Sequence, residues 1–266
     1  MPAPPLIAYT HVGKSFDAGR GSTPVLAVDD VSLEIAAGEL LAIVGGSGSG
    51  KTTLLRLANR LIDADRGSVE IDGEDVRAAD PVALRRRIGY VFQSGGLFPH
   101  LSVGSNIGIT PKLLGWPKEA IAARVDELLE LVRLDRARYR DRLPHELSGG
   151  ERQRVGVARA LAARPKIVLM DEPFGALDPL TRDALGDDYR GLHDKLGLTT
   201  VMITHDMSEA ILMADRVAVM RAGRLLAQGS PFELSESLDP YVSEMLRTPR
   251  RQAERLSALL PLGDQA

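Results

Sequence analysis

The feature that most constrains this chain of 266 residues is a glycine-rich segment, Gly45 to Thr52, that follows an apolar run. The run Leu40 to Val44 predicts a buried strand, and the leucines after the segment predict a helix. Glycines at such a junction let backbone N–H groups face an anion, and the helix adds the positive end of its dipole. The predicted phosphate-binding residues are Gly45, Gly46, Ser47, Gly48, Ser49, Gly50, Lys51, Thr52 and Thr53.

The last residues of this loop carry the chemistry. Lys51 is predicted to place a full positive charge on the β- and γ-phosphates of a nucleotide, and the Thr52 hydroxyl is predicted to bind Mg²⁺. A plain glycine turn is the alternative, but the G-x-x-x-x-G-K-T spacing after a strand favours a nucleotide site.

Composition narrows the class of ligand. A net charge of −3, with 44% hydrophobic and 26% charged residues, is ordinary for a globular protein and does not indicate a nucleic-acid binder. The phosphate is therefore expected to belong to a small ligand. The chain has no cysteine, which excludes disulfides and thiolate zinc sites. It also has no apolar window of about 18 residues, so a role at a membrane would require a partner and the cytoplasmic side.

The N-terminal part is predicted to form a small sheet. Alternating runs predict two exposed antiparallel strands, Leu6 to Tyr9 and Val31 to Ile35, with Gly19 to Pro24 as a loop between them. Phe16 lies in this part and could stack on a purine. The local sequence instead favours a partly buried hydrophobe.

Polar side chains stand at the carboxyl ends of three predicted buried strands: Gln93, the pair Asp171 and Glu172, and His205. Ligand contacts in α/β folds come from this edge. Asp171 is predicted to hold Mg²⁺, and Glu172 to orient and deprotonate a water aimed at the γ-phosphate. His205 could sense that phosphate. Gln93 could equally cap a turn, and the local sequence does not choose.

A helical region and a second anion site follow. From about Leu97 to Leu147 the pattern predicts a helical insertion within the α/β domain. Ser148 would then cap another helix, and Gly149 and Gly150 would open its backbone to an anion. An ordinary helix cap is the alternative.

Taken in order, the glycine loop, Gln93, LSGGERQ, IVLMDEP, Ala176-Leu177-Asp178 and His205 make the chain from about Leu6 to Gly229 resemble the ATP-binding-cassette ATPases. The resemblance implies an α/β fold, a P-loop NTPase (RecA-like) core with an N-terminal antiparallel β subdomain and an inserted α-helical subdomain. It places the ATPase domain at residues 1–240, with the insertion at about 97–147. Residues 241–266 are expected to form a short helical tail without a regulatory domain.

The resemblance also implies roles for matching residues. Phe16 would stack on adenine, Gln93 would lie near Mg²⁺ and the transport partner, and Asp178 would belong to a conformational loop. The signature residues would bind the γ-phosphate held by an opposing subunit; they are Ser148, Gly149, Gly150 and Gln153. The implied catalytic residues are Glu172, His205, Gln93 and Lys51, and the implied Mg²⁺ ligands are Thr52, Gln93 and Asp171.

A narrower resemblance concerns the transported solute. The segments LFPHLSVGSNI, PKLLGWPKEAI and DEPFGALDPLTRDAL are similar to ATPase subunits of osmoprotectant importers for glycine betaine, carnitine or choline. That similarity implies a homodimer that sandwiches ATP, a transmembrane permease, an extracytoplasmic solute-binding protein, no nucleic acid, and a peripheral place on the cytoplasmic face of the membrane. The alternatives are an importer of another small solute, such as an amino acid, and a soluble ABC ATPase without a permease.

Overall fold

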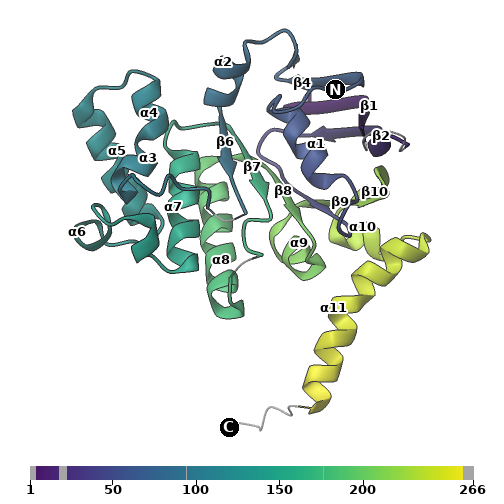
Figure 1. Cartoon of the computed structure of the whole chain (residues 1–266). Coiled ribbons are helices and arrows are strands. Elements are labelled where there is room, and N and C mark those ends of the chain that lie inside the picture. The colour runs from purple at the N-terminus through teal and green to yellow at the C-terminus, as the bar shows by residue number, and fades with distance from the viewer. Residues whose placement is uncertain (1–3, 18–22, 94, 176, 260–266) are drawn as a thin grey trace.

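Two β-sheets organise the chain in the computed structural model (Figure 1), which describes residues 4–17, 23–93, 95–175 and 177–259. The larger sheet has six strands in the order β10-β9-β3-β8-β7-β6, all parallel except β10, which pairs antiparallel with β9. Its strands are β3 (Leu40–Val44), β6 (Ile88–Val91), β7 (Ile167–Asp171), β8 (Thr199–Thr204), β9 (Arg216–Arg221) and β10 (Arg224–Gly229). This architecture confirms the predicted α/β class.

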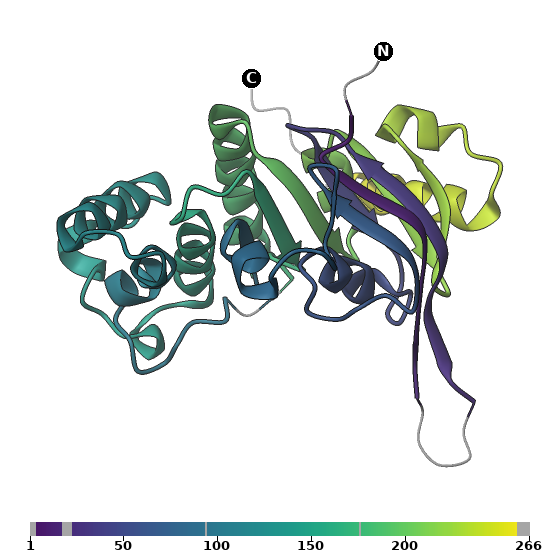
Figure 2. The ribbon, with the colours of Figure 1, turned by 90° about the horizontal axis from the view of Figure 1, so that it is seen from above.

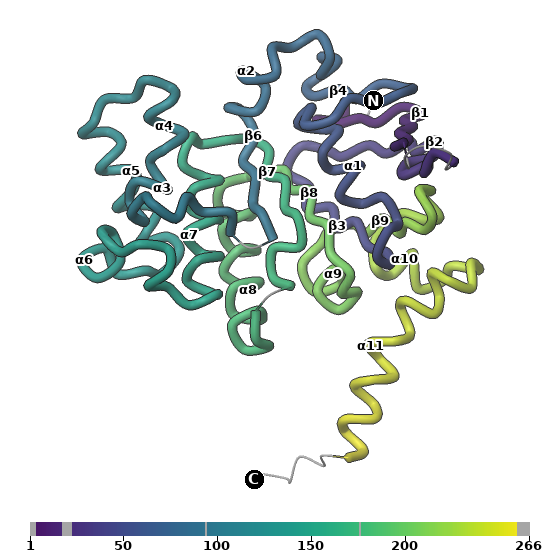
Figure 3. The backbone as a smooth tube through the Cα atoms, in the orientation of Figure 1, coloured from purple at the N-terminus to yellow at the C-terminus, as the bar shows by residue number. Residues whose placement is uncertain are grey.

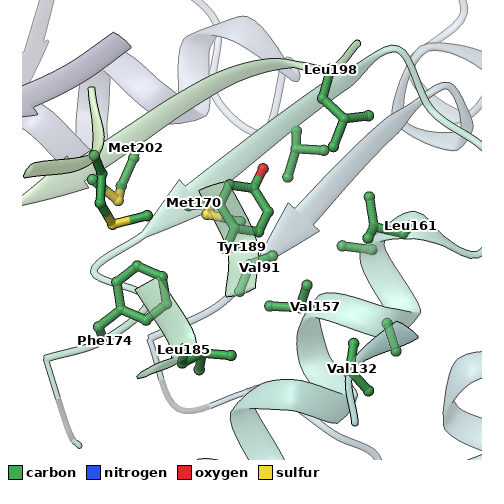
Figure 4. Packing of buried hydrophobic residues seen from close by; sticks show 14 of the residues in the cluster. Val91, Val132, Val157, Leu161, Met170, Phe174, Leu185, Tyr189, Leu198 and Met202 are labelled. Atoms are coloured by element: carbon green, nitrogen blue, oxygen red, sulfur yellow. The ribbon is translucent and has the colours of Figure 1, made fainter. Parts of the chain in front are cut away.

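The parallel strands are apolar along their length because helices cover both faces of the sheet. All five residues of β3 are buried. Leu41 and Ile43 pack with α1 (Lys51–Ala58), whereas Ala42 and Val44 belong to the cluster that contains α7 (Gly149–Leu161). Figure 4 shows part of the cluster that contains α7, where Val157 and Leu161 lie near Val91 and Met170. The two helices therefore lie on opposite faces of one sheet.

The N-terminal sheet packs on the other side of α1. It contains β1 (Ile7–Phe16), β2 (Val25–Ile35), β4 (Arg66–Ile71) and β5 (Glu74–Asp75), in the order β2-β1-β4-β5. The predicted antiparallel pair is present, with Ile7 opposite Ile35, and Figure 2 shows the two long strands side by side. The expected exposure is wrong, because Ile7 and Ile35 on one face of the pair are buried against α1. The predicted loop, Gly19 to Pro24, lies largely outside the described residues, as does Ala176.

Helices fill the chain between β6 and α7. They are α3 (Val103–Ile107), α4 (Ile109–Leu113), α5 (Lys118–Leu131), α6 (Arg136–Tyr139) and the short η1 (Pro144–Glu146); α2 (Pro81–Arg86) precedes β6. In α5, Val125, Leu128 and Leu129 are buried and belong to the same apolar cluster as α7. Figure 2 shows this helical part to one side of the strands. The division at residues 97–147 stays a prediction.

The C-terminal part adds four helices and ends on a long one. They are α8 (Pro179–Leu196), α9 (Met207–Met213), α10 (Pro231–Ser235) and α11 (Pro240–Leu259). Val242 anchors the start of α11 in the core, and Figure 3 shows the rest of the helix running away from the body. Within the described ranges, no helix is both long and apolar enough to span a bilayer. The division into residues 1–240 and a tail of 241–266 stays a prediction.

Candidate functional site

The glycine loop joins the buried end of β3 to α1 and needs glycine at two positions for lack of space. A Cβ on Gly45 would lie 2.2 Å from the Met220 carbonyl oxygen, and a Cβ on Gly50 would lie 2.1 Å from the Ala27 carbonyl oxygen. Gly50 also has φ +99, which side-chain-bearing residues rarely adopt. The loop is thus pressed against β2 and β9, and its conformation is set by backbone contacts.

Lys51 lies inside this loop. Its Nζ donates to the carbonyl oxygens of Gly45 and Gly46 at 2.8 and 3.0 Å. Burial lowers the pKa of Lys51, and the nearby charges of Glu172 and Asp171 oppose that shift. The loop therefore holds a buried positive charge close to the two carboxylates at the end of β7.

Asp171 ends β7 and has partners on both of its oxygens. The Thr52 hydroxyl donates to Oδ1 at 3.2 Å, and the Tyr90 hydroxyl donates to Oδ2 at 3.3 Å. The Arg56 guanidinium is 3.8 Å from the same Oδ2. Burial, followed by the charge of Asp171, raises the pKa of Tyr90 to about 12, so the phenol remains a donor at neutral pH. The carboxylate is therefore held with Oδ1 towards Thr52.

Glu172 faces a different set of partners because the chain turns sharply after Asp171. Glu172 has φ 45, a left-handed conformation that costs a non-glycine residue about 1 kcal/mol. Its carboxylate Oε2 accepts a hydrogen bond from Gln93 Nε2 at 2.9 Å and lies 3.3 Å from His205 Nδ1. Its backbone N–H donates to the Ile203 carbonyl oxygen at 3.0 Å, which fixes the turn against β8.

The carboxyl ends of β6, β7 and β8 thus bring the predicted residues of three strands together. The side chains that meet there, or at the adjoining loop, are Lys51, Thr52, Gln93, Asp171, Glu172 and His205. Thr52, Asp171 and the Gln93 amide offer oxygen ligands, the type that Mg²⁺ prefers alongside phosphate oxygens and water. This donor set fits the predicted ion.

The predicted second anion site lies at the start of α7, where two backbone amides already donate hydrogen bonds to side chains of the same helix start. Ser148 Oγ accepts from the Glu151 amide at 3.3 Å, and the Glu151 carboxylate accepts from the Ser148 amide at 2.7 Å. The Tyr139 hydroxyl donates to Glu151 at 2.5 Å and is the main cause of the lowered pKa of Glu151. Nothing lies within 4 Å of a Cβ built on Gly149, so this start of the helix is open outward.

Two other signature residues are less open. A Cβ on Gly150 would lie 2.5 Å from Thr181 Cγ2, so the start of α7 approaches α8 closely there. Gln153 is 2% exposed, and its Nε2 donates to the Phe92 carbonyl oxygen at 3.3 Å. It ties α7 to the segment before Gln93, and its predicted role in nucleotide binding stays a prediction.

Asp178 and Phe16 lie outside this group. Asp178 caps α8 by accepting from the Thr181 amide at 3.0 Å, and the hydrogen bonds from Thr181 lower its pKa. Phe16 ends β1 with 43% of its surface exposed, and Lys14 Nζ is 5.6 Å from the centre of its ring. An aromatic side chain this exposed is available for stacking.

Sequence reasoning missed Tyr90 and Arg56, which hold Asp171. Tyr90 is part of an otherwise apolar strand, and Arg56 is a charged residue on a helix of buried leucines. A single polar residue inside each apolar pattern was the available signal. The pairing of β6 with β7 brings Tyr90 to Asp171, and the packing of α1 on the sheet brings Arg56 there.

Comparison with known proteins identifies the family of the chain. The family model described as "ABC transporter" matches residues 28–175. In Bacillus subtilis (strain 168), the choline transport ATP-binding protein OpuBA is 47% identical over 91% of this chain, and the glycine betaine/carnitine/choline transport ATP-binding protein OpuCA is 48% identical over 96%. The chain spans 62% and 67% of the length of these two relatives.

Among solved structures, the dimeric post-hydrolysis state of the ATP-binding cassette MJ0796 bound to ADP and Pi superimposes with a TM-score of 0.77. The two chains are 31% identical, and the match covers 84% of this chain and 98% of that one. By sequence and by fold, this chain belongs to the ABC transporter family.

Proposed function

We propose that this chain is the ATP-hydrolysing, nucleotide-binding subunit of an ABC importer. The observation that carries the proposal is the placement of the Glu172 carboxylate between Gln93 and His205, beside the Thr52 and Asp171 pair. This arrangement has one carboxylate for an ion and another for a water, as phosphoryl transfer to water requires.

The first role is to bind and neutralise the triphosphate. Lys51 would exchange the carbonyls of Gly45 and Gly46 for the β- and γ-phosphate oxygens, and the amides at the start of α1 would face the same anion. Thr52, Asp171 and the amide oxygen of Gln93 would hold Mg²⁺, which supplies charge neutralisation on the phosphates.

The second role is to activate the attacking water. Glu172 would accept a proton from a water aligned with the γ-phosphate, while Gln93 Nε2 and His205 Nδ1 keep the carboxylate in position. His205 is 58% exposed at its side chain, so it is free to reach the γ-phosphate and report its presence.

The third role requires a second copy of the chain. Ser148 and Gly149 are exposed at the start of α7, on the face of the sheet opposite α1. They would bind the γ-phosphate held by the opposing subunit, so that two ATP molecules are sandwiched in a head-to-tail homodimer. Phe16 would stack on adenine, and Asp178 would lie at the contact between subunits.

A groove beside Gln93 is suited to a membrane partner. Exposed apolar residues Phe92, Phe98 and Leu113 line a cavity of about 500 Å³ between the sheet and the helical part. Contiguous exposed apolar surface marks interaction sites. We assign this groove to a transmembrane permease, which would place the subunit peripherally on the cytoplasmic face of the membrane, with no role for nucleic acid.

The names of the relatives support a proposal for the transported solute. Because their names specify choline, or glycine betaine, carnitine and choline, we propose that the importer takes up a quaternary amine osmoprotectant delivered by an extracytoplasmic binding protein.

Glu172→Gln tests the function. Removing the base while keeping the shape is expected to lower ATP turnover about 10²- to 10⁴-fold without loss of MgATP binding. The trapped MgATP is expected to convert the variant to a dimer in solution scattering, and vesicles containing its permease complex are expected to lose ATP-driven uptake of labelled choline.

Glu130→Gln, at an exposed position of α5, is the matched control and should behave as wild type. Near-normal turnover by Glu172→Gln would remove this residue as the base. Choline uptake absent from an otherwise active wild-type complex would remove the assigned solute while leaving the ATPase in place.

A further inference from the structure

The long C-terminal helix touches the phosphate loop directly. The backbone N–H of Gly46 donates to the hydroxyl of Tyr241 at 3.2 Å, across 195 residues of sequence. Tyr241 lies in the first turn of α11, outside every motif that the sequence singles out. The contact therefore links a helix with no assigned role to the centre of the site.

The tyrosine is held firmly enough to act as a fixed acceptor. Asp239 Oδ1 accepts from the amides of Tyr241 and Val242 at 2.8 and 3.1 Å, which fixes the start of α11. Val242 is fully buried. The guanidinium of Arg221 stacks 4.6 Å from the centre of the Tyr241 ring, at the end of the strand whose Met220 carbonyl confines the loop.

The peptide that donates this hydrogen bond also accepts one from Lys51. The Gly45–Gly46 peptide is a planar trans unit, so its carbonyl and its N–H point to opposite sides. The Gly45 carbonyl oxygen accepts from Lys51 Nζ at 2.8 Å, while the Gly46 N–H donates to Tyr241. A peptide between two glycines has few steric limits of its own, so these two contacts add to the backbone packing that fixes its orientation.

We propose that Tyr241 is a positioning residue for the phosphate loop. By holding the Gly46 N–H, its hydroxyl fixes the orientation of the Gly45–Gly46 peptide and keeps the loop in the form that receives a nucleotide, also after Lys51 has turned from the carbonyls to the phosphates. The inference rests on the proposed function, since it takes the ligand of the loop to be MgATP. It makes the start of α11 part of nucleotide binding.

Tyr241→Phe tests this role because it removes only the hydroxyl. The hydrogen bond is reached by water, so its loss is expected to weaken MgATP binding and raise KM for ATP by about 2- to 10-fold. At saturating ATP, kcat should stay within about twofold, because the groups around Glu172 are untouched. Arg221→Met, which leaves the hydroxyl in place but frees the ring, should raise KM in the same direction by less.

Tyr189→Phe is the matched control. It removes a buried hydroxyl that pairs with Thr200 Oγ1 at 2.7 Å, away from the loop. It should lower the unfolding midpoint in urea without changing KM for ATP, which separates positioning from general stability. If Tyr241→Phe had the KM of an active wild type, the inference would fall and the proposed function would stand. If the wild-type chain did not bind MgATP at all, both would fall.

Discussion

Two helix N-termini of this chain, both proposed to bind phosphate, differ in how their first turns are capped. At the start of α1, Gly50 occupies the cap position and provides no side-chain hydrogen bond. At the start of α7, Ser148 and Glu151 form a reciprocal capping box. At α1 no side chain caps the first amides, so they are available to a ligand. At α7 two amides already donate hydrogen bonds to the side chains of Ser148 and Glu151.

This difference in capping suggests different roles for the two proposed phosphate sites. The α1 start has Lys51, Asp171 and Glu172 around it, which would complete the proposed anion and metal site. The α7 start has the carboxylate of Glu151 in its first turn and lies on the opposite face of the sheet. We therefore expect it to be too weak to hold a triphosphate alone, whereas under the proposed function it would add donors to one that is already bound elsewhere.

Lys51→Ala has the largest expected effect, because it should weaken the α1 site and leave the α7 start unchanged. Removing the ammonium is expected to cost the α1 site two charge-assisted hydrogen bonds to phosphate, which lowers MgATP affinity by about 100-fold or more. Isothermal titration calorimetry checks this, with the exposed Lys195→Ala as control. Unchanged affinity would mean that the α1 start does not hold the phosphates.

A second comparison uses two glutamates in the first turns of helices. Glu151 in α7 has a lowered pKa, chiefly through its hydrogen bond from Tyr139. Glu209, in the first turn of α9, has its pKa raised by burial from 4.5 to about 7, with Asp206, Arg182, His205 and Thr204 close to it. Among the described residues, its Oε1 has no hydrogen-bond partner. Burial outweighs the favourable helix dipole at Glu209.

The sign of the pH effect follows. Folded protein keeps Glu209 protonated at pH values where the unfolded chain has ionised it, so its stability contribution is full below about pH 4.5 and is lost as pH rises through about 7. The shift corresponds to about 3 kcal/mol. Urea unfolding from pH 4.5 to 8 should show this loss in wild type and not in Glu209→Gln. Parallel curves would contradict it. Because the pKa of Glu151 is lowered, its stability contribution is present above about pH 4.5 and is lost as pH falls below that value, so Glu151→Gln should change the curve there and with the opposite sign.

Ser148→Ala has the smallest expected effect, but it tests directly whether the start of α7 acts on the nucleotide of a second subunit. If the α7 start serves a partner's nucleotide, the variant should bind MgATP like wild type as a single chain. In the Glu172→Gln background it should then dimerise about tenfold less tightly, because one donor to the partner's phosphate is lost. Solution scattering against protein concentration measures this.

Ser230→Ala is its matched control, because Ser230 and Glu233 form the same capping box at α10. Both variants should lose about 1 kcal/mol of stability from the missing cap. Equal dimerisation of the two variants would show that Ser148 is only a helix cap.

Local patterns were sufficient for much of the fold and for the gathering of the central side chains. The apolar runs predicted β3, β7 and β8, and parallel strands deliver their carboxyl ends to one edge, which is where Glu172 meets Gln93 and His205. The extent of β1 and β2 was not predicted, because their buried face depends on α1 rather than on the strands themselves.

The sequence by itself determined the phosphate loop, the polar residue that ends each buried strand and the helix cap at Ser148, because each of these features depends on residues within a few positions of one another. Only the tertiary structure decided that Tyr90 holds Asp171, that Gln153 turns inward to Phe92, and that Tyr241 reaches Gly46. Those contacts join residues 61 to 195 positions apart. Their partners are selected by how strands and helices pack, and no local spacing encodes that packing.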